Sequence, residues 1–171
     1  MPGSPGTHHL AAALRGPVVA ALVTGLVAIP RTPSAAADGP WYPPLVPLRL
    51  TAAFDPPDRD WLPGHRGVDL GTGPGSIVRA AGPGVVTFAR DLAGRGVVSI
   101  DHGSLRTTYE PIDARVVVGQ HVGAGAPIGT SVTGTGHCGT AMCVHVGLLR
   151  GREYLDPMLL FGPRTALLRP W

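Results

Sequence analysis

The 171-residue sequence contains no lysine, and all fourteen of its basic residues are arginines. Schiff-base chemistry, a phosphate-loop lysine and a lysine-borne prosthetic group all need a lysine amine, so each is excluded. Aromatic residues are also scarce, at 5% of the chain. No apolar run reaches the roughly 20 residues that span a bilayer, so an uncleaved membrane anchor is only the alternative to a cleaved signal segment.

The first forty residues differ in character from the rest. Arg15 precedes an apolar run over residues 16–29, and three alanines at positions 35–37 are acceptable to a signal peptidase. We interpret residues 1–37 as a secretory signal peptide, which makes the mature protein secreted and free of a stable membrane anchor. Arg15 and Arg31 leave with this segment and no acidic residue does, so the net charge falls from +3 to about +1. That balance predicts no nucleic-acid partner.

The remaining residues, about 130 of them, suffice for one domain with a single core, which we expect to be a monomer. The chain has 25 glycines, 19 prolines and many short valine-rich runs. This pattern predicts an all-β domain with an antiparallel sheet that is folded over or forms a sandwich. We expect strands at residues 48–54, 76–80, 84–89, 96–101, 105–109, 127–130 and 143–149, with helical character only at 157–160.

These elements divide the chain into four parts. The signal peptide is followed by a Pro-rich lead-in and first strand over residues 38–53, then by a β-sheet core domain over 54–162 and a tail over 163–171. The stretch from Asp38 to about Pro47 is expected to be extended and to lie outside the core.

Two distant segments supply the residue types of a metal site. Residues 64–69 read Gly-His-Arg-Gly-Val-Asp, and residues 143–145 read Cys-Val-His. Two imidazoles and one carboxylate are the ligands of a catalytic zinc ion whose fourth position is left to water. On a straight strand His65 and Asp69 would stand about 13 Å apart, too far to share one ion. We therefore predict that the chain bends at Gly67.

The glycines in residues 118–129 are spaced as tight turns between short strands require. Lipoyl and biotinyl carrier domains have turns of this kind. Those domains attach their cofactor to a lysine, which this chain lacks, so we interpret the segment as scaffold.

Cys143 has three possible roles. In a strand it shares a face with His145, while Val144 and Val146 face the other way. It could be a thiolate ligand that closes the zinc site, a reactive nucleophile, or one half of a disulfide with Cys138. The disulfide is favoured, because the compartment is oxidising and no base is adjacent in sequence.

With these motifs in chain order, the sequence resembles the lysostaphin-type (LytM-like) zinc metallopeptidases, which are peptidoglycan endopeptidases. The resemblance rests on residues 64–69, 78–86, 98–103 and 107–109, on the glycine-spaced turns up to 129, and on His145 ahead of residues 155–157. It implies an antiparallel β fold, a zinc cofactor held by His65, Asp69 and His145, and cell-wall peptides as partners.

The family also uses two histidines that orient the attacking water and stabilise the tetrahedral intermediate. The first would end a Tyr-x-His pattern, but residues 109–111 read Tyr-Glu-Pro; the second would stand at Cys143. Proline has no proton to offer, so we consider His137 and Glu110 as catalytic groups that replace them. For each the alternative is an ordinary loop residue or a solvated surface residue. His102, at the end of a predicted strand, is expected to be structural.

Two functions are compatible with these residues. The first is a secreted zinc metallo-endopeptidase that cleaves the peptide cross-links of cell-wall peptidoglycan. The alternative is a catalytically degenerate relative that binds cell-wall peptide or regulates another wall hydrolase. The intact set of three ligands favours the enzyme, whereas Pro111 and Cys143 are explained more simply by the alternative.

The signal-peptide interpretation can be tested by N-terminal sequencing of exported protein. The mature chain is expected to begin at Asp38, because the apolar run ends at Ile29 and small residues follow. Recovery of the intact Met1 end from a membrane fraction would contradict this prediction.

Overall fold

The computed structural model describes residues 40–59, 61–133, 138 and 142–161, together with Met1 and Gly3. Apart from Met1 and Gly3, the predicted signal peptide at 1–37 lies outside the described residues, as does the predicted tail at 163–171. No helix in the described part of the chain is long and apolar enough to cross a membrane.

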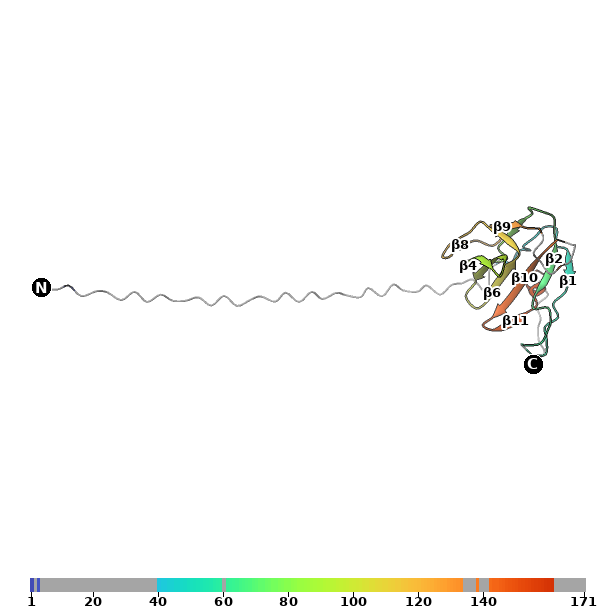
Figure 1. Ribbon diagram of the computed structural model, residues 1–171, viewed down its shortest axis with the longest axis horizontal. Coiled ribbons are helices and arrows are strands. Elements are labelled where there is room, and N and C mark those ends of the chain that lie inside the picture. Colours follow the sequence, from blue (N-terminus) through green and yellow to red (C-terminus); the bar gives the residue numbers. More distant parts are fainter. Residues whose placement is uncertain (2, 4–39, 60, 134–137, 139–141, 162–171) are drawn as a thin grey trace. The chain divides into compact units, whose positions relative to one another are not determined.

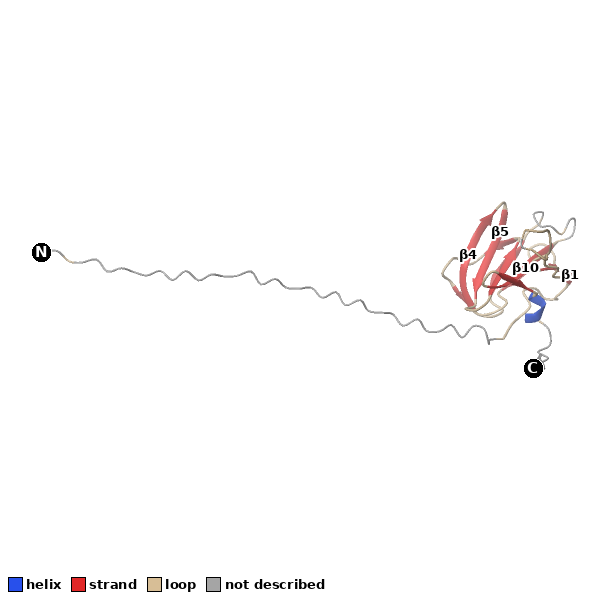
Figure 2. Ribbon diagram, turned by 90° about the horizontal axis from the view of Figure 1, so that it is seen from below, coloured by secondary structure: helices blue, strands red, loops and turns tan. Residues whose placement is uncertain are grey.

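The described residues form an all-β fold with antiparallel pairing throughout, which confirms the predicted fold class (Figure 2). In chain order the strands are β1 (Leu50–Ala52), β2 (Val68–Gly71), β3 (Ile77–Arg79), β4 (Gly84–Leu92), β5 (Arg95–Asp101), β6 (Arg106–Glu110), β7 (Ile112–Ala114), β8 (His121–Val122), β9 (Pro127–Ser131), β10 (Cys143–Arg150) and β11 (Glu153–Leu155). A 3-10 helix, η1 (Pro157–Leu160), follows where helical character was predicted.

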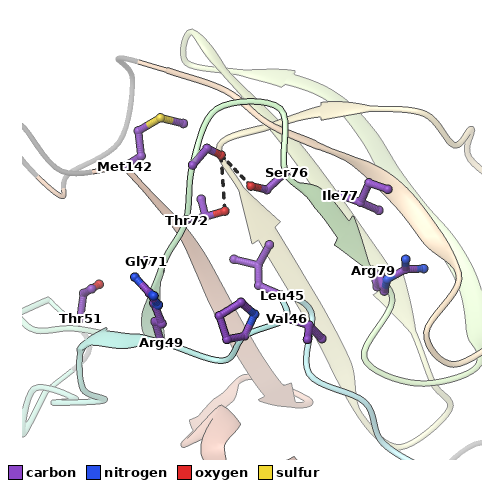
Figure 3. Close-up of a pocket in the computed structure, with 12 residues that line it drawn as sticks. Leu45, Val46, Arg49, Thr51, Gly71, Thr72, Ser76, Ile77, Arg79 and Met142 are labelled. Atoms are coloured by element: carbon purple, nitrogen blue, oxygen red, sulfur yellow. Dashed lines mark hydrogen bonds between the residues drawn. The ribbon is translucent and has the colours of Figure 1, made fainter.

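The strands form two sheets. The larger has the order β1-β2-β10-β6-β5-β4-β8, with β11 paired to β10, and the smaller has the order β3-β9-β7 (Figure 1). Gly119 and Gly125 have φ values of 87° and 74°, which favour glycine and confirm the predicted tight turns around β8. Strands β1 and β3 each end a sheet, and residues of both line a groove (Figure 3).

Side chains along β2 and β10 point alternately to the two faces of the larger sheet, and one of these faces packs in the core. Val68, Leu70, Val144 and Val146 are fully buried and belong to one apolar cluster with residues of the smaller sheet such as Ile128. Each such side chain contributes on the order of 1.5–3 kcal/mol to folding. The predicted separation of these residues from the His145 face is therefore confirmed.

The prediction that the Pro-rich lead-in lies outside the core is wrong. Leu45 is 3% exposed and Trp41 packs against the core cluster. Backbone hydrogen bonds anchor the segment, since the Arg79 N–H donates to the Pro44 carbonyl at 2.9 Å. Proline has no backbone N–H group, but its carbonyl oxygen can accept a hydrogen bond. A Pro-rich segment can therefore still be hydrogen-bonded to a strand. The first strand, predicted at residues 48–54, is the shorter β1 (Leu50–Ala52).

A chain of buried hydrogen bonds joins His102 to β6. The His102 Nδ1 atom lies 2.7 Å from the Pro83 carbonyl oxygen, which can only accept, so Nδ1 carries the proton. The Nε2 atom then accepts from the Thr107 hydroxyl at 2.7 Å, and Thr107 accepts from the Tyr109 hydroxyl at 2.8 Å. The Ala81 N–H donates to Tyr109 at 2.8 Å and completes the chain. His102 is thus structural, as predicted.

Burial lowers the pKa of His102 below 6.5, against smaller opposing effects of the Pro83 hydrogen bond and the Asp101 charge. Burial likewise raises the pKa of Tyr109 to about 12. Below pH 6.5 an unfolded chain binds a proton at His102 that the folded chain does not. This residue therefore contributes stability that is present above pH 6.5 and is lost as the pH falls toward its folded pKa.

We predict that the His102 ring stays neutral, with its proton on Nδ1, when metal-free protein is titrated from pH 7.5 through 6.5. Nitrogen NMR of the imidazole distinguishes the tautomers and reports the titration directly. Exposed His121 serves as the reference signal in the same spectra. A His102 ring that is half protonated at or above pH 6.5 would refute the assignment.

Candidate metal centre

The register of the larger sheet places three ionisable side chains in one row. In β10, His145 is paired with Asp69 of β2 on one side and with Glu110 of β6 on the other. Directly paired residues project from the same face of an antiparallel sheet, with Cβ atoms about 4.5–5.5 Å apart. The sheet thus assembles a carboxylate, an imidazole and a second carboxylate from three segments.

His65 reaches this row from the segment before β2. Its backbone is held by Asp55, since the His65 N–H donates to the Asp55 carbonyl at 2.7 Å and the His65 carbonyl accepts from the Asp55 N–H at 3.0 Å. The chain then turns at Gly67 before β2 begins, which confirms the predicted bend. The His65 ring comes to lie beside the His145 ring, with centroids 4.9 Å apart.

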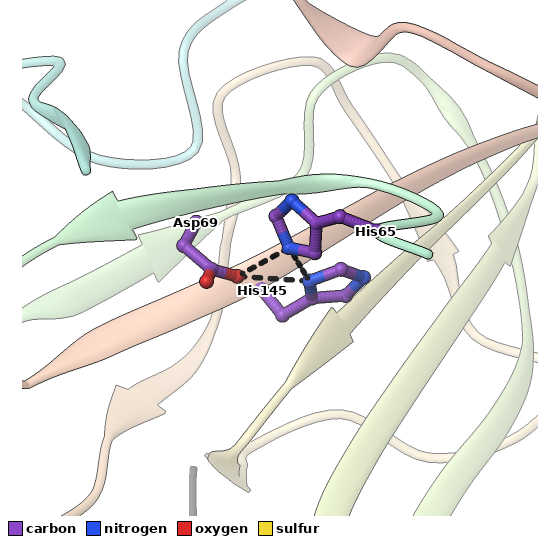
Figure 4. Close-up of side chains that lie close together, drawn as sticks. All are labelled: His65, Asp69 and His145. Carbon is purple, nitrogen blue, oxygen red and sulfur yellow. Dashed lines mark hydrogen bonds and ion pairs between the residues drawn. The ribbon is translucent and has the colours of Figure 1, made fainter. Parts of the chain in front are cut away.

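Three ligand atoms converge, as Figure 4 shows. Asp69 Oδ1 lies 3.1 Å from His65 Nε2 and 2.9 Å from His145 Nδ1, and the two ring nitrogens are 3.2 Å apart. In a tetrahedral zinc site with bonds of about 2.0–2.1 Å, neighbouring ligand atoms stand about 3.3 Å apart. The cluster therefore fits a zinc ion with only small adjustments.

Hydrogen bonding at the outer nitrogen of His65 strengthens this fit. His65 Nδ1 lies 2.5 Å from the Ala53 carbonyl oxygen, so Nδ1 must carry a proton. In the neutral ring, Nε2 then presents a lone pair to the carboxylate of Asp69. Two acceptors that face each other repel, and a cation between them removes the repulsion. A histidine whose outer N–H bonds to a carbonyl is also the usual arrangement of a metal ligand.

Gly67 allows the bend to pass close to β10. A Cβ atom at this position would clash with the Val146 carbonyl oxygen and would stand 2.6 Å from His145 Nε2. Only glycine leaves the His145 ring in place, so the site depends on this residue sterically.

Cys138 and Cys143 are joined by a disulfide, which confirms the favoured prediction. Their Cα atoms are 6.1 Å apart and no described cysteine is free, so the thiolate-ligand and nucleophile roles do not apply to this form. Both sulfur atoms lie within 4.8 Å of an Asp69 carboxylate oxygen. The disulfide therefore covers one flank of the metal centre.

Glu110 borders the site and is partly exposed. Together with His65, Arg66 and His145, it lines a cavity of about 330 Å³. The other lining residues are Gly64, Thr108 and Tyr154. Its Oε2 atom lies 3.6 Å from Arg95 Nε, a distance that makes an ion pair but is too long for a hydrogen bond.

The other proposed catalytic residue, His137, lies outside the described residues. Sequence reasoning missed Thr108 and Tyr154 as cavity residues. Strand alternation could have found Thr108, which stands two residues before Glu110 and faces the same side. Nothing in the sequence around Tyr154 points to the site, because only the return of β11 along β10 brings it there.

Comparison with known proteins agrees with this geometry. Residues 63–157, more than half of the chain, match the model of peptidase family M23. Rv2891, an uncharacterised protein of Mycobacterium tuberculosis strain H37Rv, is 44% identical over 134 residues, which cover 75% of this chain and 54% of the relative. The chain thus spans about half the length of the curated relatives it matches.

Solved structures share the fold of this chain. A zinc-containing peptidase from Vibrio cholerae is 28% identical, with a TM-score of 0.56 over 67% of this chain and 37% of that one. Lysostaphin from Staphylococcus simulans is 22% identical, with a TM-score of 0.57 over 72% and 55%, and shares the fold. The fold and the cluster agree with the family match. The chain belongs to peptidase family M23, so the resemblance to lysostaphin-type peptidases is confirmed.

We predict that Gly67→Ala weakens zinc binding by at least about tenfold, because the added methyl group displaces His145. Competition with a chromophoric chelator measures the affinity. Gly123→Ala is the matched control, since a Cβ atom there meets nothing within 4 Å. Equal zinc affinity in the two variants would show that the close approach does not position the ligand.

Proposed function

We propose that this chain is an exported zinc metallo-endopeptidase that cleaves the peptide cross-links of cell-wall peptidoglycan. The observation that carries the proposal is the convergence of His65, Asp69 and His145 within 3.2 Å of one another, beside a cavity that Glu110 also lines. Membership of family M23 supports a peptidase related to peptidoglycan hydrolysis. Export is supported by the predicted signal peptide and by the usual extracellular or periplasmic location of the family.

We propose His65, Asp69 and His145 as the ligands. Zinc bound there would lower the pKa of a water molecule and polarise the scissile carbonyl group. Asp69 supplies the negative charge, and its 3% exposure keeps water from competing for the carboxylate. The Ala53 carbonyl holds His65 in the tautomer that leaves Nε2 free to coordinate.

Glu110 is proposed as the proton-transfer group. It is paired with His145 across the strands, lines the same cavity and is partly exposed, so a carboxylate oxygen can accept a proton from water in that cavity. Arg95 forms an ion pair with this carboxylate and does not line the cavity. His137 remains a second proposed group for this role.

Two residues favour a different function. Pro111 and Cys143 stand where the family places its two assisting histidines, and the Cys143 sulfur is bound in a disulfide. The alternative proposal is a relative that binds cell-wall peptide, or regulates another wall hydrolase, without cleaving a bond. The two proposals differ in one observable, the release of new peptide ends from the wall.

We expect Glu110→Gln to bind zinc normally but to hydrolyse purified cell wall about 10²–10⁴-fold more slowly, because the amide cannot accept the proton. His145→Ala is expected to lose both zinc and hydrolysis while most of the fold remains. New amino ends released from the wall and zinc content per chain are the two measurements.

Glu153→Gln, in exposed β11, is the control for loss of one carboxylate. If His137→Ala loses hydrolysis and Glu110→Gln does not, His137 is the proton-transfer group. A wild-type chain that binds zinc but releases no peptide ends from any wall tested would support the binding or regulatory alternative.

A further inference from the structure

A second cavity lies between the edges of the two sheets, away from the metal centre. It has a volume of about 810 Å³, compared with about 330 Å³ at the metal centre, and the two cavities share no lining residue. Figure 3 shows that its walls come from the Pro-rich segment with β1, from the connection between β2 and β3, and from β3. Its size is typical of a ligand-binding pocket.

Backbone hydrogen bonds fix the wall formed by the Pro-rich segment. The Gly71 N–H donates to the Arg49 carbonyl at 2.8 Å, and the Arg79 N–H donates to the Pro44 carbonyl at 2.9 Å. Leu45 lies between these two points and is 3% exposed. The groove is thus held open between two anchored ends and is present before any ligand arrives.

The wall formed by the β2–β3 connection is equally well fixed. The Gly73 carbonyl oxygen accepts hydrogen bonds from the hydroxyl groups of Ser76 at 2.8 Å and Ser131 at 2.7 Å. The Ser131 hydroxyl also accepts from the Ser76 N–H at 3.0 Å. These bonds tie the connection to β9. Binding of a ligand would therefore cost little conformational entropy at this wall.

Charge in the groove has one sign. Arg49 and Arg79 line it, and no aspartate, glutamate or histidine does. Arg79 Nη1 donates to the Gly125 carbonyl at 3.0 Å, which orients the guanidinium and leaves its other N–H groups available. Within the described part of the chain, neither arginine forms an ion pair with an acidic side chain. A carboxylate is the complementary group, because a guanidinium binds it through paired hydrogen bonds.

Strand β3 presents backbone groups to the same groove. In an antiparallel ladder, successive residues direct their N–H and C=O groups to opposite sides. Ser76 bonds to Ser131 of β9, whereas the Arg79 N–H points away from β9 to Pro44. Ile77 shares the side of Arg79, so its backbone groups face the groove. An exposed sheet edge of this kind accepts an extended peptide as an added strand.

An apolar rim completes the groove. Val46 is 80% exposed and Ile77 is 50% exposed, and Pro47 and Met142 lie with them along the groove. Large apolar side chains that gather at a pocket, and are not scattered over the surface, are characteristic of a binding site.

From these observations we propose that the groove binds an extended acidic peptide. Its carboxylates bind Arg49 and Arg79, its backbone pairs with Ile77, and an apolar side chain covers Val46. The site does not depend on the proposed hydrolysis, because it uses none of the residues at the metal centre.

The probe is the pentapeptide acetyl-Glu-Val-Glu-Val-Glu-amide, and its control is the same peptide with every Glu replaced by Gln. With the whole protein, calorimetry is expected to show binding of the Glu peptide at least about tenfold tighter than the Gln peptide. Arg49→Gln and Arg79→Gln should each weaken it about fivefold or more, and added salt should weaken it further. In amide NMR spectra, the Ile77 N–H signal is expected to shift on binding.

Arg150→Gln, at the exposed end of β10 and outside both cavities, controls for loss of one positive charge. His145→Ala should bind the peptide as the wild type does, which separates this site from the metal centre. If Arg79→Gln fails to fold, exposed Arg49 carries the test alone. Equal affinity for the two peptides, an equal loss in Arg150→Gln, an unshifted Ile77 signal, or inorganic phosphate binding as tightly as the Glu peptide would each overturn the proposal.

Discussion

The register between β2 and β10 is the constraint on which the metal centre depends. It places His145 opposite Asp69 on one face and Val146 opposite Val68 on the other. A slip by one residue would turn the charged groups into the core and the valines toward solvent. The burial of Val68 and Val146 therefore stabilises the fold and aligns two proposed ligands through the same contacts. The stability of the core and the geometry of the site cannot be varied independently here.

The third proposed ligand needs a separate constraint, because His65 does not belong to a strand of the sheet. Its backbone pairs with Asp55, its ring bonds to the Ala53 carbonyl, and Gly67 lets the bend approach β10. All three contacts are local to one turn and the segment beside it. This explains why the motif from 64 to 69 is recognisable as a unit, whereas His145 is defined by the strand that carries it.

The three proposed ligands could be predicted from the sequence. The motif at 64–69 contains two of them, and the alternation of apolar and polar residues in β10 indicates the third. Strand β2 was not predicted, since its four residues include Asp69 and a terminal glycine, which are uncommon in strands. The burial of Leu45 could not be predicted, because the prolines around it are typical of an extended segment outside the core. The place of Glu110 follows from pairing between strands far apart in sequence, which no local pattern encodes.

The cluster at the proposed metal centre buries a carboxylate group that needs compensating partners. Asp69 is 3% exposed, and burial of a charged carboxylate is unfavourable unless opposite charge or hydrogen bonds compensate it. A neutral His65 ring with its proton on Nδ1 would turn a lone pair toward the same oxygen at 3.1 Å, whereas His145 Nδ1, 2.9 Å away, can donate to it. A cation bound among these atoms would attract both the carboxylate and the His65 lone pair. A stable β fold alone does not require this cluster, so the arrangement supports the proposed metal ion.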